Sequence, residues 1–123
     1  MRSIIASAIL LVAAAPAWAA AIPVAFQGDW APNLAECRDI DHISVMTIGP
    51  NYISFYEAET IEGTLRILRS TKTELVLTNR MRGEGRRFKV TLNLRLSANR
   101  KTMTWSGFGR DPKEARLDVR CPK

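Results

Sequence analysis

Residues that commonly build catalytic and metal centres are scarce in this chain, whose 123 residues include one histidine and two cysteines. Two isolated cysteines and one histidine fall short of the four ligands that a structural zinc site requires. The sequence also contains no nucleic-acid-binding motif and no specific catalytic or cofactor signature. These absences predict a protein that holds no metal or cofactor, does not bind nucleic acid and is not an enzyme.

The sole histidine, His42, follows Asp39 and Asp41 in the one segment where carboxylates and an imidazole adjoin. In a strand the two aspartates share a face and His42 points to the other. The three side chains therefore do not converge on a metal ion or form an acid–base pair. We interpret residues 39–42 as a polar segment that leads into a strand.

Two further catalytic arrangements find no support in the sequence. A Ser-His-Asp triad needs a serine within reach of a histidine that a carboxylate orients, and the serines here are scattered over expected strands. Glu57, Glu59 and Glu62 could include a pair of glycosidase carboxylates, but they gather at an expected hairpin end, where acids are ordinarily solvated. We predict no catalytic residues.

Long apolar runs are also absent, except for one at the N-terminus. Arg2 precedes an apolar stretch over residues 4–15, and Ala17 and Ala19 place small residues where a signal peptidase reads them. The stretch is too short for a bilayer, which requires roughly 20 apolar residues. We predict a cleavable signal peptide over residues 1–19 and a single domain over residues 20–123. The mature chain would be periplasmic or secreted, monomeric and without a transmembrane segment.

The two cysteines, Cys37 and Cys121, allow one intramolecular pairing. Exported proteins experience oxidising conditions, and small domains gain from a covalent link. Closing a loop of about 85 residues would stabilise the fold by about 4–5 kcal/mol. The sequence therefore predicts a Cys37–Cys121 disulfide.

Charge is distributed unevenly along the chain. Residues 20–63 carry seven acids and one base, whereas residues 64–123 carry sixteen bases and five acids. Arg80, Arg82, Arg86 and Arg87 crowd around a glycine-flexed hairpin tip at residues 83–85. Arginine suits phosphate and carboxylate geometry, so these four side chains predict contact with an anionic partner such as lipopolysaccharide or an acidic protein.

Strand periodicity recurs along the mature chain. Over residues 88–96 apolar and polar side chains alternate strictly, as in a strand with one buried face. Residues 31–39 instead favour a short helical or 3₁₀ plug that delivers Cys37. Counting a short opening strand, the expected strands are 26–30, 43–48, 52–57, 64–69, 73–78, 88–96, 102–108 and 116–121.

Seven or eight short antiparallel strands in about 100 residues favour an all-β meander barrel, because closure removes exposed strand edges. A two-sheet β-sandwich would show the same alternation and stays open as an alternative. The expected inward side chains are mostly bulky and leave little room for a large ligand: Val45, Ile53, Phe55, Leu65, Ile67, Leu75, Leu77, Phe88, Val90, Leu92, Leu94, Met103, Trp105, Leu117 and Val119.

A second apolar set lies on the opposite face of the early expected strands. It is either covered by the plug at residues 31–39 or forms a patch for a partner. Its members are Met46, Ile48, Tyr52, Tyr56, Leu68 and Val76.

Residues 26–30 contain Gly28-x-Trp30, which resembles the opening signature of lipocalins. In that family the tryptophan closes one end of the barrel and a late arginine packs across it. The resemblance implies a lipocalin-like barrel in which Trp30 is covered by Arg116 or Arg120.

The whole mature chain also resembles a group of small, uncharacterised exported bacterial proteins. The shared pattern is Phe-x-Gly-x-Trp, a cysteine, Phe-Tyr-Glu, Gly-Glu-Gly and a final Arg-Cys. This chain carries it at residues 26–30, 37, 55–57, 83–85 and 120–121. The group implies no activity.

Two functions fit these expectations. The favoured one is a non-catalytic binding or inhibitory module that contacts an envelope component or an enzyme through its loop ends. The alternative is a lipocalin-like carrier of a small apolar ligand, which needs a cavity of a few hundred Å³ or more.

Overall fold

A computed structural model describes residues 21–38, 44–108 and 114–123, which are nearly all β-structure. The expected signal peptide and the segment with Asp39, Asp41 and His42 lie outside the described residues. No helix in the described part of the chain is long and apolar enough to cross a membrane. The elements are η2 (Val24–Phe26), β1 (Gly28–Ala31), η3 (Glu36–Arg38), β2 (Met46–Ile48), β3 (Ile53–Phe55), β4 (Ala58–Thr60), β5 (Arg66–Ser70), β6 (Glu74–Gly83), β7 (Arg86–Leu96), β8 (Thr102–Ser106) and β9 (Arg116–Arg120).

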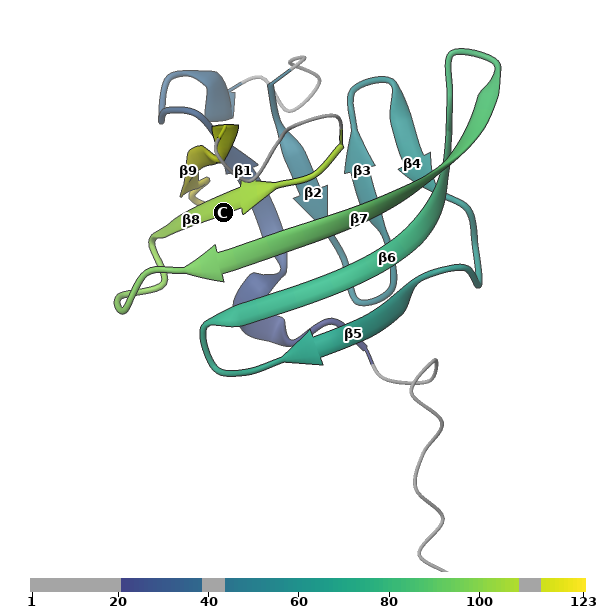
Figure 1. The fold of residues 1–123 in the computed structure, drawn as a ribbon. Helices are drawn as coiled ribbons and strands as arrows, with labels where there is room; N and C mark the ends of the chain where they lie inside the picture. The colour runs from purple at the N-terminus through teal and green to yellow at the C-terminus, as the bar shows by residue number, and fades with distance from the viewer. Residues whose placement is uncertain (1–20, 39–43, 109–113) are drawn as a thin grey trace, which may run out of the picture.

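Eight of the strands close into an antiparallel barrel, as Figure 1 shows. The sheet order is β4-β3-β2-β1-β9-β8-β7-β6-β5, and an additional pairing of β4 with β6 completes the ring. One edge of β6 pairs with β4 near the β6–β7 turn and with β5 farther along, so β5 is an extra strand outside the ring. The predicted lipocalin-like barrel is confirmed, and the two-sheet sandwich is not observed.

Two strands differ from the expected ones. β6 continues to Gly83, five residues beyond the end expected at Thr78, and β4 was not expected. Because most residues from Asn79 onward are polar, the sequence pattern does not predict that β6 continues. In the structure β7 pairs with β6 along its whole length. Because β6 is long, it reaches β4 and closes the barrel.

Most of the expected inward side chains form the core. Nine are buried in the main core, where Phe55, Ile67 and Phe88 are partly buried against them, and Val45 is buried in a second cluster. Phe26 and Trp30 add large aromatic rings to this core. The nine buried residues are Ile53, Leu65, Leu75, Leu77, Val90, Leu92, Leu94, Met103 and Trp105.

The orientation expected for the last strand, β9, is wrong. Leu117 is 59% exposed, whereas its neighbour Asp118 is fully buried. Cross-strand partners lie on the same face of a sheet, and Asp118 pairs with buried Met103. Leu117 and Val119 therefore face outward, because the charged residues of β9 find partners inside the barrel.

The orientation expected for β2 is also inverted. Met46 and Ile48 point into the core, while Val45 is buried in a second cluster with Ala31 and Cys121. The register pairs Met46 with Trp30, which fixes this inward face.

The plug is confirmed as a short 3₁₀ helix, η3, which lies against β1. The predicted disulfide joins Cys37 in this helix to Cys121 after β9, across a sequence separation of 84. Together they cover Ala31 and Val45. The plug does not cover the second apolar set: Met46 and Ile48 are core residues, Val76 is half-buried, and Tyr52, Tyr56 and Leu68 are exposed.

Replacing both cysteines with serine (Cys37→Ser with Cys121→Ser) should lower the free energy of unfolding by about 4–5 kcal/mol, because the unfolded chain loses a long covalent loop. Urea denaturation followed by circular dichroism measures the change. Reduced wild-type protein should match the double variant. An unfolding midpoint that does not respond to reduction would contradict the expected role of the disulfide.

Candidate functional site

One end of the barrel is closed by Trp30, whose side chain is fully buried. Its indole N–H donates to the Phe26 carbonyl at 3.0 Å, and the Arg120 guanidinium carbon lies 4.3 Å from the centroid of its ring. Arg120 also donates to the carbonyls of Gln27 at 2.8 Å and Arg100 at 3.0 Å. Of the two arginines that the lipocalin resemblance named, Arg120 is the one that covers Trp30.

Partial burial, and secondarily the positive charge of Arg100, lower the pKa of Arg120 from its ordinary value. A guanidinium nonetheless remains charged in proteins. Arg120 therefore acts as a permanent cation over the indole face, a contact that adds to its hydrogen bonds.

Arg116, the other named arginine, covers a different tryptophan. Its guanidinium carbon lies 4.9 Å from the centroid of Trp105. It makes two hydrogen bonds to the Asp118 carboxylate, at 2.7 and 2.9 Å, and another to the Ser44 carbonyl at 2.8 Å. The indole N–H of Trp105 donates to the same carboxylate at 3.1 Å. This network satisfies the charge of the buried Asp118.

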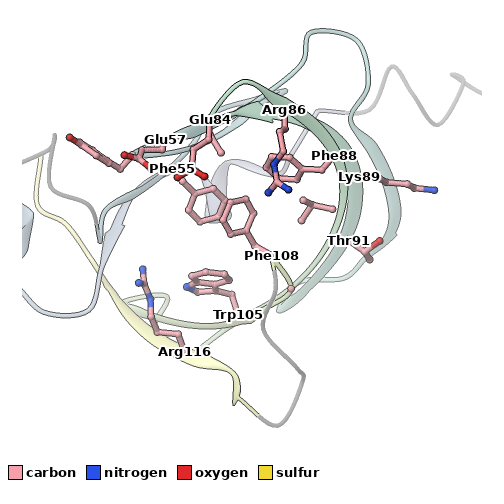
Figure 2. A pocket seen from close by; sticks show the side chains of 15 residues that line it. Phe55, Glu57, Glu84, Arg86, Phe88, Lys89, Thr91, Trp105, Phe108 and Arg116 are labelled. Carbon is pink, nitrogen blue, oxygen red and sulfur yellow. The ribbon is translucent and has the colours of Figure 1, made fainter.

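The opposite end of the barrel is open, and a pocket of about 730 Å³ lies there. We call this end the mouth, and Figure 2 shows it from close by. The β3–β4 turn, the β6–β7 turn and the segment after β8 form its rim. The lining residues are Phe55, Tyr56, Glu57, Ala58, Gly83, Glu84, Arg86, Phe88, Lys89, Val90, Thr91, Trp105, Gly107, Phe108 and Arg116.

Four aromatic rings, three from different strands and one from the segment after β8, meet at the mouth. Phe108 stacks on Phe55 with ring centroids 4.5 Å apart, and contacts the edge of Phe88 at 5.7 Å. Phe55 in turn lies 5.6 Å from Trp105. The aromatic surface thus spans β3, β7, β8 and the segment after β8. Phe55, Phe88, Val90 and Trp105 were expected to fill the interior, but they line this pocket, so the sequence did not predict the hollow at the mouth.

The backbone after β8 places Phe108 at the centre of this cluster. Phe108 has a φ of 53°, a left-handed conformation that bulky residues rarely adopt. The preceding Gly107 has a φ of 109°, and a Cβ there would lie 2.2 Å from the Thr91 carbonyl oxygen. Glycine lets the chain approach β7 closely, and the next residue then projects over the mouth (Figure 2).

The four arginines predicted to bind an anionic partner do not lie on one surface. Arg86 shares the inward face of β7 with Phe88, and its side chain points into the mouth (Figure 2). Arg80, Arg82 and Arg87 occupy the alternate positions of β6 and β7 and are exposed on the outer face. The side-chain alternation of the hairpin separates Arg86 from the other three.

The acids that were weighed as a glycosidase pair are also separated. Glu57 is at the rim of the mouth, Glu59 is exposed on β4, and Glu62 is exposed in the next turn. Glu57 is instead close to Glu84 across the rim. A hydrogen bond to Glu84, and secondarily the negative charge of Glu84, raise the pKa of Glu57.

Sequence reasoning missed two residues at this end. One is Phe108, and the other is Asn79, which is 1% exposed and pairs with the pocket residue Val90. Its Oδ1 accepts a hydrogen bond from Thr60 at 2.8 Å, but its Nδ2 has no partner among the described residues. A signal for Asn79 existed in the sequence, since it follows Leu75 and Leu77 in period two and so predicts a polar group inside the barrel.

Within the described residues, no group of three or more His, Cys, Asp or Glu side chains could hold a metal ion. Comparison of the chain with protein-family models, curated proteins and solved structures found no match. The resemblance to exported bacterial proteins therefore stays a prediction, and inference about function depends on the geometry of the mouth.

The Glu57–Glu84 contact predicts a pH-dependent stability. The folded protein holds a proton on Glu57 more tightly than the unfolded chain does, so stability falls as pH rises from the ordinary value of 4.5 through the raised pKa. Glu57→Gln should flatten this part of the profile. Urea midpoints measured across this pH range test it, with Glu62→Gln as the control, and a slope that persists in Glu57→Gln would contradict the assignment.

Proposed function

We propose that this protein is a non-catalytic binding module that takes a small, largely apolar molecule at the mouth of its barrel. The observation that carries the proposal is the open pocket of about 730 Å³, whose lining includes a cluster of four aromatic rings in contact with one another. Ligand sites commonly have volumes of about 300–1,000 Å³, apolar walls and a few polar groups. Of the two functions that the sequence left open, the carrier gains more from this geometry.

The polar groups at the mouth suit recognition better than catalysis. Arg116 forms an ion pair with Asp118, and the indole N–H of Trp105 donates to the same carboxylate. Glu57 is engaged with its neighbour at the rim, because a hydrogen bond to Glu84 and the negative charge of Glu84 raise the pKa of Glu57. We therefore propose a binding protein without catalytic activity.

Asn79 is buried and pairs across the hairpin with the pocket residue Val90, but it does not itself line the pocket. A buried amide donor without a partner costs about 1–3 kcal/mol of stability. The Nδ2 atom of Asn79 is such a donor among the described residues.

We further propose that the protein works outside the reducing cytosol, in the periplasm or as a secreted protein, and that it is a monomer. The Cys37–Cys121 disulfide supports the proposed location, because such bonds persist in oxidising compartments.

Titration with N-phenyl-1-naphthylamine, a neutral apolar dye that fluoresces in dry surroundings, tests the proposal. The purified chain should bind the dye saturably, and Phe88→Ala should weaken binding by about tenfold, since an aromatic contact contributes on the order of 1 kcal/mol. Phe88 is suitable because it lines the pocket while only partly buried.

Tyr52→Ala is the matched control, because Tyr52 is an exposed aromatic residue that does not line the mouth. Its dye affinity should equal that of the wild type. The proposal fails if the wild type shows no saturable binding, or if Tyr52→Ala weakens binding as much as Phe88→Ala.

A further inference from the structure

The outer face of the β6–β7 hairpin gathers four cations into a compact group. Arg80 pairs directly with Lys89, and Arg82 pairs directly with Arg87. Opposite residues in an antiparallel sheet have Cβ atoms about 5 Å apart, and alternate residues along a strand are separated by about 7 Å. We call these four exposed residues the cationic patch.

Figure 2 shows that Lys89 points away from the barrel, whereas Arg86 points into it. The patch thus differs from the arginine set predicted from the sequence, with Lys89 in place of Arg86. It lies on the convex outer wall, and of its four residues Lys89 also belongs to the lining of the pocket at the mouth.

Like charges directly opposite each other destabilise a sheet, and the patch contains two such pairs. Within the described residues, none of the four side chains has an ion pair or a side-chain hydrogen bond. The acid nearest in register is Glu59, which lies opposite Arg82 on β4. One carboxylate opposite four cations leaves the patch strongly positive.

At the other end of the same hairpin, the positive charges are neutralised by an acidic residue within the protein. There Glu74 makes ion pairs with Arg69 at 3.4 Å and with Arg95. Two cations share one acid in direct contact, while the patch has no such contact. The hairpin therefore presents a positive surface specifically at the end near the mouth.

We propose that the cationic patch binds the phosphate headgroups of an acidic phospholipid membrane. Its charge is complementary to anionic headgroups, which attract clusters of Lys and Arg at a membrane surface. Headgroups move within the bilayer, so they can collect at four closely spaced cations. Arginine forks match phosphate oxygens.

The composition of the patch favours headgroups over a folded acidic protein. Protein interfaces place aromatic and other apolar residues at their centre and are poor in lysine. The patch contains a lysine, and the next outward pair along the hairpin is Thr78 with Thr91. The two cross-strand pairs that make up the patch are charged, and neither contains an apolar residue that could anchor a protein partner.

Co-sedimentation with vesicles tests the proposal. The purified chain should bind vesicles of phosphatidylcholine and phosphatidylglycerol mixed two to one, but not vesicles of phosphatidylcholine alone. Binding should weaken as salt is added. Arg87→Gln should reduce affinity about fivefold, and glutamine at all four patch positions should reduce it by about a hundredfold or more.

Arg86→Gln is the matched control, because it removes the same charge from the adjacent residue, whose side chain points into the mouth. It should leave vesicle binding close to that of the wild type. The fourfold variant should fold at least as stably as the wild type in a thermal melt, since it relieves the repulsion between paired cations. The triple variant with Arg80→Gln, Arg82→Gln and Arg87→Gln leaves the pocket residue Lys89 in place and should also keep its affinity for N-phenyl-1-naphthylamine.

Three results would overturn the proposal. The first is equal binding to charged and uncharged vesicles. The second is an equal loss of affinity in Arg86→Gln and Arg87→Gln. The third is binding to soluble polyglutamate without binding to the charged vesicles, which would make an acidic protein the partner.

Discussion

The structure depends on the charged face of β9, which points into the barrel. Arg116, Asp118 and Arg120 alternate along this face, and the two arginines lie over Trp105 and Trp30. A buried carboxylate is tolerated only when it is paired and hydrogen-bonded, and Asp118 has three hydrogen bonds from Arg116 and Trp105. Because these contacts need both tryptophans, they fix the register of β9 between β1 and β8.

This arrangement makes the two ends of the barrel different. At the closed end Arg120 donates to backbone carbonyls before β1 and covers Trp30. At the mouth, Arg116 and Asp118 neutralise each other beside Trp105. The aromatic rings of the mouth are therefore left with little unpaired charge at their base. An apolar ligand in the mouth, and anionic headgroups on the neighbouring outer wall, are compatible uses of this end.

The fold follows from the sequence where apolar and polar residues alternate, as they do along β7. The same rule fails at β9, because Leu117 and Val119 carry the apolar pattern while Asp118 is the buried residue. Burial of Asp118 depends on its hydrogen bonds from Trp105 and Arg116, which the apolar periodicity of the strand does not reveal. The opposite orientations of Arg86 and Arg87 can be predicted from the number of residues that separate each from Phe88. The position of Phe108 cannot be predicted in this way, because it follows from an unusual backbone conformation after Gly107.

Matched asparagine substitutions at adjacent positions of β9 test the central claim most directly. Asp118→Asn leaves Arg116 without a charged partner in the interior, which should cost about 3–5 kcal/mol of unfolding free energy. Leu117→Asn changes an exposed side chain and should cost about 0.5 kcal/mol or less. Urea denaturation of both variants compares them under one condition. A larger loss for Leu117→Asn than for Asp118→Asn would show that the apolar face of β9 points inward, and would contradict the account.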